Sequence, residues 1–494
     1  MPILCLNFFK EMKILKVTDL LNDIDYNILQ GRDDLIVEGL NYNSKAIKDG
    51  EAFFCIKGLK TDGHKYVESA IENGAKVIVC EDPIVTKDTD ITIIKVNDTR
   101  KALAIAASNY YDNPSKKMKV IGVTGTNGKT TTAFMIKSVL EKAGFKVGLI
   151  GTVANYIGDK KLKAERTTPE SLELHKLFYD MIKAGVDYCV MEVSSHSLYL
   201  HRVYGIEFSD AIFTNLTQDH LDFHKTMENY FQAKCILFNN ATNKIINADD
   251  EYGKRIIRSF KGCSTYSIYE NSDLKAFDIV NTSKGISFDV SINGKLENIK
   301  LMIPGIHNVY NSLAVIKVAL LNNIDFNEIK EGLKSARVPG RCELIEHNDK
   351  LDFDIIIDYA HTPDALEKIL KSAREFTEGR LLCVFGCGGD RDVTKRPIMG
   401  KIASELSDLI FVTSDNPRSE EPKKIIDDII KGISKDNYVI EENRKEAIFK
   451  AIKEGRHKDV IVIAGKGHED YQVLKDKVID FDERKVIKEL LQRL

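Results

Sequence analysis

A glycine-rich segment has the residue types and spacing that bind phosphate. Gly122-Val123-Thr124-Gly125-Thr126-Asn127-Gly128-Lys129-Thr130 follows an apolar run and opens a helical segment. Glycines let backbone N–H groups close around phosphate oxygens, and the helix N-terminus adds its positive end. Lys129 is placed to reach the β- and γ-phosphates, and Thr130 to hold Mg²⁺. The strict P-loop has glycine where Val123 stands, so the segment differs from an ordinary kinase or GTPase loop.

Two further segments could supply metal ligands. Glu192 ends an apolar run, and Asp219 to His224 contains two histidines and two aspartates in six residues. That mixture is compatible with zinc, but phosphate chemistry favours Mg²⁺ with oxygen ligands. By residue type alone, a packed or solvated loop histidine is the favoured interpretation of His220.

Lys234 is the only charged residue between Tyr230 and Phe238. A lysine in such a segment usually extends its ammonium to solvent. In an apolar setting the ammonium is disfavoured, and a neutral amine can react with CO₂. Both interpretations remain open from the sequence.

A polar cluster near residue 416 could recognise a carboxylate. It reads Asp415-Asn416-Pro417-Arg418-Ser419-Glu420, in which the planar guanidinium of Arg418 can bind a carboxylate through two hydrogen bonds. The alternative is an N-capped turn with proline at a helix start.

These residues follow apolar runs that predict buried parallel strands. Seven such runs end in polar or glycine-rich clusters: 119–123, 188–191, 211–213, 355–357, 381–385, 409–412 and 460–463. Alternation of such runs with helical segments predicts open α/β sheets, which bind ligands beyond the carboxyl ends of their strands.

Two polar breaks, Asp112–Lys117 and Arg337–Arg341, divide the chain. They predict three domains, at residues 1–115, 116–337 and 338–494. We expect an α/β fold with a smaller N-terminal α/β domain, a central P-loop-type, mostly parallel sheet flanked by helices, and a C-terminal Rossmann-like α/β domain.

Composition excludes several classes of function. The 494 residues include 71 Lys and Arg against 74 Asp and Glu, a net charge of -3, which does not favour a nucleic-acid partner. Nine scattered cysteines indicate reduced thiols, and no apolar run is long enough for membrane insertion. We expect a cytoplasmic monomer without a signal peptide, in which Met12 is an alternative start to Met1.

The phosphate segment resembles the ATP loop of the Mur ligase superfamily, which includes folylpolyglutamate synthetases. Family members use ATP to activate a carboxylate as an acyl phosphate, which an amine then displaces. The resemblance runs from about Asp19 to the end of the chain. It implies Mg²⁺ as cofactor, with Thr130, Glu192, His220 and carbamylated Lys234 as its site. It implies these ATP-binding residues: Thr124, Gly125, Thr126, Asn127, Gly128, Lys129, Thr130, Thr131, Asn308, Asn311, Arg341 and Asp358.

Other segments resemble the members that add the third or final residue of the muropeptide. They imply contacts to UDP-MurNAc-L-Ala-D-Glu by Ser44, Lys60, Thr61, Thr167, Thr168, Ser194 and Arg202. The cluster at residue 415 resembles the members that add meso-diaminopimelate. It implies contacts to that amino acid by Arg391, Asp415, Asn416, Pro417, Arg418, Gly465 and Glu469.

The resemblance therefore implies a ligase of peptidoglycan precursor synthesis, which serves cell-wall biogenesis, cell shape and cell division. Catalysis would involve Lys129, Glu192, His220 and Lys234. The sequence leaves open a close analogue such as lanthionine, a folylpolyglutamate synthetase, and a related ligase that adds lysine or another diamino acid. Rivals from other classes are a P-loop NTPase switch or transporter motor and a catalytically inactive nucleotide-binding scaffold.

Overall fold

The computed structural model describes residues 14–58, 61–347 and 351–492. These residues form two compact units. The first extends up to Gly122 and includes residues 146–211 and 224–242, whereas the second contains residues 123–145, 212–223 and those from Asn243 onward. Met1 and Met12 lie outside the described residues.

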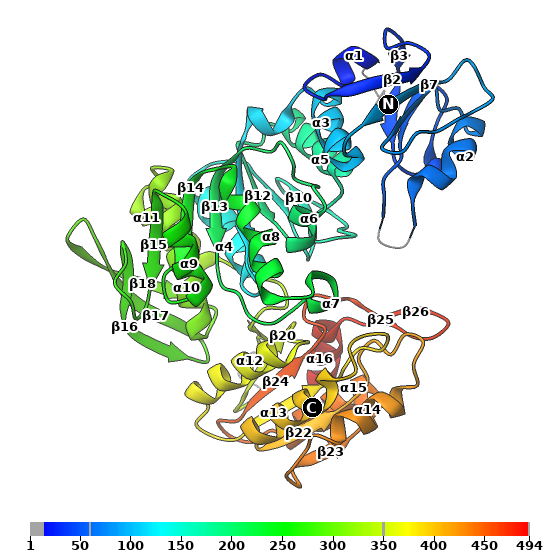
Figure 1. The fold of residues 1–494 in the computed structure, drawn as a ribbon. Helices are drawn as coiled ribbons and strands as arrows, with labels where there is room; N and C mark the ends of the chain where they lie inside the picture. Colours follow the sequence, from blue (N-terminus) through cyan, green and yellow to red (C-terminus); the bar gives the residue numbers. More distant parts are fainter. Residues whose placement is uncertain (1–13, 59–60, 348–350, 493–494) are drawn as a thin grey trace, which may run out of the picture. The chain divides into compact units, whose positions relative to one another are not determined.

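The N-terminal part of the first unit is a five-stranded sheet with the order β2-β7-β6-β5-β4 (Figure 1). Strands β4 to β7 pair in parallel, and β2 is antiparallel to β7. The elements are β1 (Leu15–Lys16), α1 (Val17–Leu20), β2 (Tyr26–Gln30), β3 (Ile36–Val37), β4 (Gly39–Asn41), β5 (Glu51–Phe54), α2 (Val67–Glu72), β6 (Val77–Cys80), β7 (Thr92–Val96) and α3 (Thr99–Tyr110).

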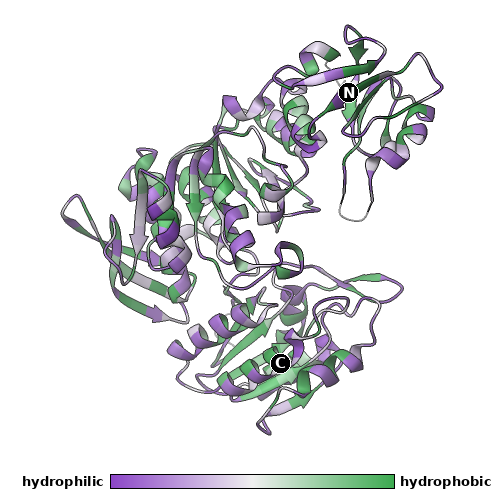
Figure 2. Ribbon diagram, in the orientation of Figure 1, coloured by the Kyte–Doolittle hydropathy of each residue, from purple (hydrophilic) through white to green (hydrophobic). Residues whose placement is uncertain are grey.

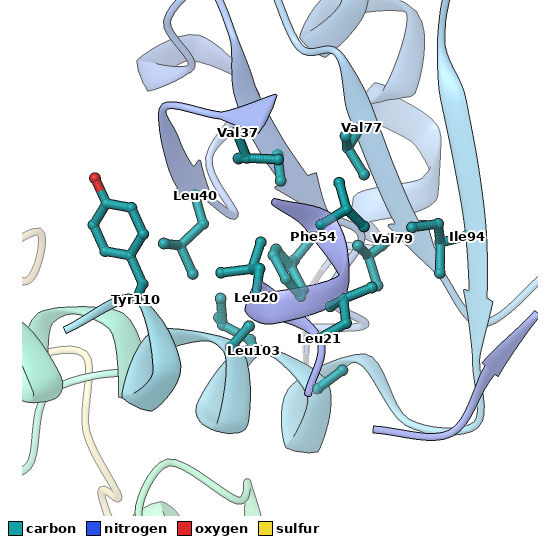
Figure 3. Close-up of a cluster of buried hydrophobic side chains, with 14 of the residues drawn as sticks. Leu20, Leu21, Val37, Leu40, Phe54, Val77, Val79, Ile94, Leu103 and Tyr110 are labelled. Atoms are coloured by element: carbon teal, nitrogen blue, oxygen red, sulfur yellow. The ribbon is translucent and has the colours of Figure 1, made fainter. Parts of the chain in front are cut away.

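The core of this sheet is apolar and continuous. Side chains from α1 and α3 pack against one face of the strands, where Leu20, Phe54 and Leu103 are almost fully buried (Figure 3). The Asp98 side chain accepts hydrogen bonds from the Arg100 and Lys101 N–H groups and so caps α3. The covered face therefore fixes this part of the chain independently of any ligand.

The remainder of the first unit contains six strands of an eleven-stranded sheet, in the order β11-β10-β9-β12-β8-β13. Strand β12 is parallel to β9, and all five of its residues are buried. The elements are β8 (Lys119–Thr124), β9 (Val147–Ile150), β10 (Asn155–Ile157), β11 (Lys160–Leu162), α5 (Ser171–Lys183), β12 (Tyr188–Glu192), α6 (Ser195–Tyr199), β13 (Phe208–Phe213) and α8 (Met227–Asn239).

The carboxyl ends of β8 and β13 belong to the second unit. The second unit also contains the remaining strands of this sheet, in the order β14-β15-β16-β17-β18. Helix α11 packs against α4 so closely that a Cβ at Gly332 would lie 2.5 Å from the Cα of Val139. The elements are α4 (Lys129–Lys142), α7 (Leu221–His224), β14 (Ala241–Asn247), α9 (Glu251–Ser259), β15 (Cys263–Ser267), β16 (Leu274–Thr282), β17 (Gly285–Ile292), β18 (Lys295–Leu301), α10 (Ile306–Leu321) and α11 (Phe326–Ser335).

The C-terminal part of the second unit is a six-stranded sheet in the order β19-β20-β24-β21-β22-β23, parallel except for β19. Figure 2 shows hydrophobic residues along its strands and hydrophilic residues on the surrounding helices. The elements are β19 (Glu343–Leu344), β20 (Asp354–Asp358), α12 (Pro363–Phe376), β21 (Leu381–Phe385), α13 (Lys395–Leu406), β22 (Leu409–Val412), α14 (Pro422–Ile430), β23 (Tyr438–Ile440), α15 (Arg444–Glu454), β24 (Val460–Ala464), β25 (Tyr471–Val473), β26 (Val478–Asp480) and α16 (Glu483–Leu491).

The predicted fold class is confirmed: the chain is α/β, with mostly parallel sheets flanked by helices. Each of the seven apolar runs lies in a strand of the structure. The antiparallel strands β16 to β18 are an addition that the sequence analysis did not predict. Within the described part of the chain, no helix combines the length and apolarity needed to cross a bilayer.

His175 on α5 is an isolated buried polar group. It is fully buried, its ring meets Phe178 edge-on at 5.8 Å, and neither ring nitrogen has a hydrogen-bond partner among the described residues. Burial lowers the pKa of His175 to about 3, so the folded protein keeps the ring neutral.

We predict that His175→Leu reduces the sensitivity of folding to acid. Below pH 6.5 the unfolded chain binds a proton at this position that the folded chain rejects, so His175 lowers stability as pH falls. The loss at pH 5 is about 2 kcal/mol, or about 4–8 °C in unfolding midpoint. Thermal unfolding at pH 7.5 and pH 5 measures it. If the unfolding midpoints at pH 7.5 and pH 5 differ by as much in the variant as in the unmodified protein, the account is contradicted.

Candidate functional site

The phosphate segment forms a tight loop between β8 and α4. Gly125 and Gly128 have φ angles of 152° and 87°, which side chains disfavour. A Cβ at Gly128 would also lie 2.6 Å from Asn311 Oδ1. The loop therefore requires glycine both for its backbone shape and for its close approach to α10.

Two residues after β13 hold this loop. The Thr126 and Asn127 N–H groups donate to the Asn215 carbonyl (2.9 Å) and Asn215 Oδ1 (3.0 Å). Thr214 Oγ1 donates to the Asn127 carbonyl at 2.6 Å. Neighbouring strand ends thus fix the position of the loop before any ligand binds.

The lysine of the loop lies over the loop itself. Lys129 Nζ donates to the carbonyls of Gly125 (3.0 Å) and Thr126 (2.8 Å). Thr130 and Thr131 follow at the start of α4, and both are buried. A positive charge and a helix N-terminus therefore coincide, as an anion site requires.

A cavity of about 460 Å³ opens beside the loop, within the size range of small-ligand sites. Its walls come from the loop, the chain after β14, α10, the start of the C-terminal part and α12. Its lining includes Asn127, Gly128, Thr131, Asn247, Asp249, Asp250, His307, Asn308, Tyr310, Asn311, Arg341, Asp358, Lys368 and Ser372.

The asparagines predicted on α10 form a hydrogen-bonded chain along one wall. Thr132 Oγ1 donates to Asn311 Oδ1 (3.2 Å), and Asn311 Nδ2 donates to Asn308 Oδ1 (3.0 Å). Asn308 Nδ2 donates to the Pro304 carbonyl at 2.7 Å. The neighbouring His307 is half-buried, and desolvation lowers its pKa to about 4, which leaves it neutral at physiological pH.

Arg341 and Asp358 lie on the opposite wall. The guanidinium carbon of Arg341 is 4.6 Å from the centre of the Tyr359 ring, and Arg341 Nε is buried without a hydrogen-bond partner among the described residues. Asp358 accepts from the Cys342 and Ala360 N–H groups, each at 2.8 Å. Burial raises the pKa of Asp358. The guanidinium of Arg341 in the cavity wall suits an anionic ligand.

In the first unit, the end of β12 brings several predicted residues together. Glu192 is fully buried and accepts from the Thr152 N–H (2.9 Å) and Oγ1 (3.1 Å). Thr168 Oγ1 donates to the Glu192 carbonyl at 2.8 Å and accepts from the Ser194 N–H at 3.1 Å. Thr167 Oγ1 is 3.0 Å from Thr152 Oγ1.

Arg202 reaches the same region. Its Nη1 donates to the Thr168 carbonyl at 3.1 Å, and its Nε lies 2.8 Å from Glu170 Oε1. Arg166 and Arg100 also approach the Glu170 carboxylate, at 2.9 and 3.6 Å. Three guanidinium groups around one carboxylate leave an excess of positive charge suited to an anionic ligand.

Lys234 lies in the middle of α8 and is 1% exposed, with its Nζ 4.7 Å from the centre of the Tyr230 ring. The structure therefore favours a buried lysine over one that extends to solvent. His220 is exposed, and its Nε2 is 3.5 Å from Asp219 Oδ2. The hydroxyl of Thr130 and the carboxylate of Glu192 are hard oxygen donors, which fit Mg²⁺.

The predicted N-terminal contacts lie in separate surroundings. Ser44 opens a short turn, and its carbonyl accepts a hydrogen bond from Asn73 Nδ2. Thr61 Oγ1 is 3.0 Å from the Tyr66 hydroxyl. Among the described residues, these contacts do not join Ser44 to Thr61. Lys60 lies outside the described residues.

The cluster after β22 is built together with the loop after β24. Asn416 Nδ2 donates to Glu469 Oε2 at 2.8 Å, and Asp415 is 6% exposed. Arg418 has a left-handed backbone (φ 52°), and its Nη1 donates to the Gly389 carbonyl at 2.8 Å.

Of the other predicted residues of this cluster, Pro417 and Gly465 make backbone hydrogen bonds and Arg391 is exposed. The Pro417 carbonyl accepts from the Glu420 N–H, and the Gly465 N–H donates to the Asp358 carbonyl. Arg391 is exposed, and its Nη1 is 3.5 Å from the Asp390 carbonyl. The structure thus brings together Asp415, Asn416 and Glu469 more tightly than Arg391.

Sequence reasoning missed Asp249, Lys368 and Lys466 as parts of these sites. Asp249 accepts from the Tyr310 hydroxyl at 2.8 Å beside the cavity. The signal was present, because Asn247-Ala248-Asp249-Asp250 is another polar cluster after a strand. Lys368 gave no signal, since its place in the wall follows from how α12 packs.

Three family models match the chain. The Mur ligase family catalytic domain matches residues 36–111, the Mur ligase middle domain residues 123–319, and the Mur ligase glutamate ligase domain residues 340–467.

Similar proteins with known names are ligases. A UDP-N-acetylmuramoyl-L-alanyl-D-glutamate–2,6-diaminopimelate ligase of Clostridium tetani is 58% identical over 97% of this chain and 100% of its own. One from Aquifex aeolicus is 46% identical, over 92% of this chain and 94% of its own. A solved structure of a ligase of that name has a TM-score of 0.71 at 27% identity and covers 97% of this chain and 99% of its own. A Mycobacterium tuberculosis folylpolyglutamate synthase shares the fold, with a TM-score of 0.63 at 16% identity over 80% and 96% of the two chains.

We predict that Gly128→Ala weakens ATP binding by about tenfold or more. A side chain at φ 87° costs about 1–2 kcal/mol, and its Cβ would displace Asn311. Titration with a non-hydrolysable ATP analogue measures the effect. The control is Gly144→Ala, because a Cβ at Gly144, outside the site, has no neighbour within 4 Å. Equal affinity for the analogue in Gly128→Ala and the unmodified protein would contradict the assignment of the loop.

Proposed function

Because the chain belongs to the Mur ligase family, we propose that it uses ATP to join meso-diaminopimelate to the D-Glu γ-carboxylate of UDP-MurNAc-L-Ala-D-Glu. The reaction is a cytoplasmic step of peptidoglycan precursor synthesis. The observation that carries the choice of amine is the joint placement of Asp415, Asn416, Arg418 and Glu469, which offers acceptors to an ammonium and a guanidinium to a carboxylate.

In the first step the γ-carboxylate attacks the γ-phosphorus of ATP, and ADP leaves. The loop N–H groups and Lys129 hold the phosphates and balance their negative charge. Asn308 and Asn311 border the nucleotide, and the guanidinium of Arg341 in the cavity wall contacts the same ligand. Thr130, Glu192 and His220 would hold Mg²⁺, which supplies positive charge between the two anions.

In the second step the diaminopimelate amine attacks the carbonyl carbon of the acyl phosphate. A C–N bond forms, the bond from carbon to the phosphate oxygen breaks, and phosphate leaves as the amine loses a proton. No nucleophile from the protein is required, so the positioning of the two reactants carries most of the rate increase.

The muramoyl dipeptide lies against the first unit. Thr167, Thr168 and Ser194 offer hydroxyl and backbone donors, and Arg202 offers a guanidinium to a diphosphate or carboxylate. Ser44, Lys60 and Thr61 contact the UDP moiety. The domain boundaries that we assign are residues 1–115 for this substrate, 116–337 for ATP and 338–494 for the amino acid.

We also propose that Lys234 reacts with CO₂ to form a carbamate. The ammonium first loses a proton, and the neutral Nζ then attacks the carbon of CO₂ and loses a second proton, so that an anionic carbamate replaces a buried cation. Its burial beside the Tyr230 ring supports this, because burial disfavours the charged ammonium form of a lysine. The carbamate would add an oxygen ligand to the Mg²⁺ site.

The experiment is a ligation assay with UDP-MurNAc-L-Ala-D-Glu, ATP and a panel of amines. We expect meso-diaminopimelate to be joined, with lysine and glutamate rejected and lanthionine as the critical comparison. Preference for lysine or glutamate, or ATP hydrolysis without amide formation, would contradict the proposal.

We predict that Arg418→Ala raises the KM for meso-diaminopimelate by about 10–100-fold, because a charged hydrogen bond contributes about 1.5–3 kcal/mol. ATP binding should be unchanged. The exposed Arg456, altered to alanine, is the matched control. Normal diaminopimelate kinetics in Arg418→Ala would show that this guanidinium does not recognise the substrate.

A further inference from the structure

Lys466 is a fully buried cation at the centre of the C-terminal cluster. It follows β24 and has no exposed surface. Its Nζ lies 3.3 Å from Asp415 Oδ1, 3.1 Å from Asn416 Oδ1 and 3.4 Å from Glu469 Oε2. One ammonium thus contacts all three of the groups assigned to bind the substrate amine. We call Asp415, Asn416, Lys466 and Glu469 the Lys466 cluster.

Lys466 fixes which way the Asn416 amide points. Asn416 Oδ1 accepts from Lys466 Nζ and from the Val473 N–H at 2.9 Å. With the oxygen bound to two donors, Nδ2 must face the other way, where it donates to Glu469 Oε2. The carboxylate of Glu469 therefore has one oxygen held inside the cluster, and its Oε1 faces the Tyr359 hydroxyl at 3.5 Å.

Lys466 also sets the charge of the cluster. Asp415 and Glu469 are two carboxylates, so the ammonium of Lys466 leaves one net negative charge. The adjacent buried ion pair is neutral in itself, because Arg444 and Glu483 meet at 2.7 Å. A single additional ammonium would make the Lys466 cluster neutral, whereas without Lys466 the buried Asp415 carboxylate and the half-buried Glu469 carboxylate would lose the cation that they share.

We propose that Lys466 is a positioning residue that determines amine binding. It holds Asp415, Asn416 and Glu469 in place as hydrogen-bond acceptors. The net negative charge that remains can be neutralised by one ammonium group of a diamino acid. The inference rests on the proposed function, because it assumes that the amine substrate binds at this cluster.

The test compares Lys466→Met with Lys466→Arg and with the control Lys475→Met, whose lysine is exposed. Each full-length variant is assayed for the KM of meso-diaminopimelate, the KM of ATP, kcat and binding of an ATP analogue. Formation of the acyl phosphate is measured separately, without amine, by trapping it with borohydride.

We expect Lys466→Met to raise the KM for meso-diaminopimelate by about tenfold or more, with acyl-phosphate formation and the KM of ATP within about twofold of the unmodified protein. Lys466→Arg should recover most of the amine affinity, because it retains the charge. A merely structural role would instead lower the folded fraction, which reduces kcat and leaves the KM for the amine unchanged.

An unchanged KM for meso-diaminopimelate in Lys466→Met would overturn the inference. If Lys466→Met binds no ATP analogue because it does not fold, Lys466→Gln takes its place: a KM for meso-diaminopimelate raised about tenfold with normal ATP binding supports the inference, and an unchanged KM overturns it. If the unmodified protein forms acyl phosphate but joins no diamino acid, the proposed function fails instead.

Discussion

The constraint on which the rest of the structure depends is that cations needed for anionic substrates must be held in place before those substrates arrive. Lys129 lies on two loop carbonyls, Arg202 on Glu170 and Arg418 on the Gly389 carbonyl. Each charge is thus oriented by oxygen acceptors of the protein itself. Groups fixed in this way need little rearrangement during the reaction, which is how electrostatic stabilisation becomes effective.

The fold provides these acceptors through its strand ends. Strands β8, β13 and β14 stop at neighbouring positions, so the loops after them can exchange hydrogen bonds, as Asn127 does with Thr214 and Asn215. In the C-terminal sheet, β22 and β24 lie on either side of β21, and the loops that follow them supply Asn416 and Glu469, which share a hydrogen bond. Buried apolar strands create the rigid edge, and the polar residues just beyond it carry the chemistry.

The sequence predicted the parallel strands and the phosphate loop, because continuous apolar runs and glycine spacing are local signals. It did not predict the strands β16 to β18, whose alternating pattern is interrupted by a bulge between Phe277 and Val280. Nor did it identify Lys466, although the family resemblance implied substrate contacts by the nearby Gly465 and Glu469. A buried lysine looks like a solvated one in sequence, and only packing brings three acceptors around its Nζ. Lys368 in the wall of the cavity was missed for the same reason.

The central claim is that the γ-carboxylate of the muramoyl dipeptide is activated by phosphorylation before the amine attacks it. The most direct test is to label both γ-carboxylate oxygens with oxygen-18 and to analyse the phosphate released during ligation by mass spectrometry. The account predicts one labelled oxygen in the inorganic phosphate and the other in the new amide. Phosphate that is free of label while amide is formed would contradict it.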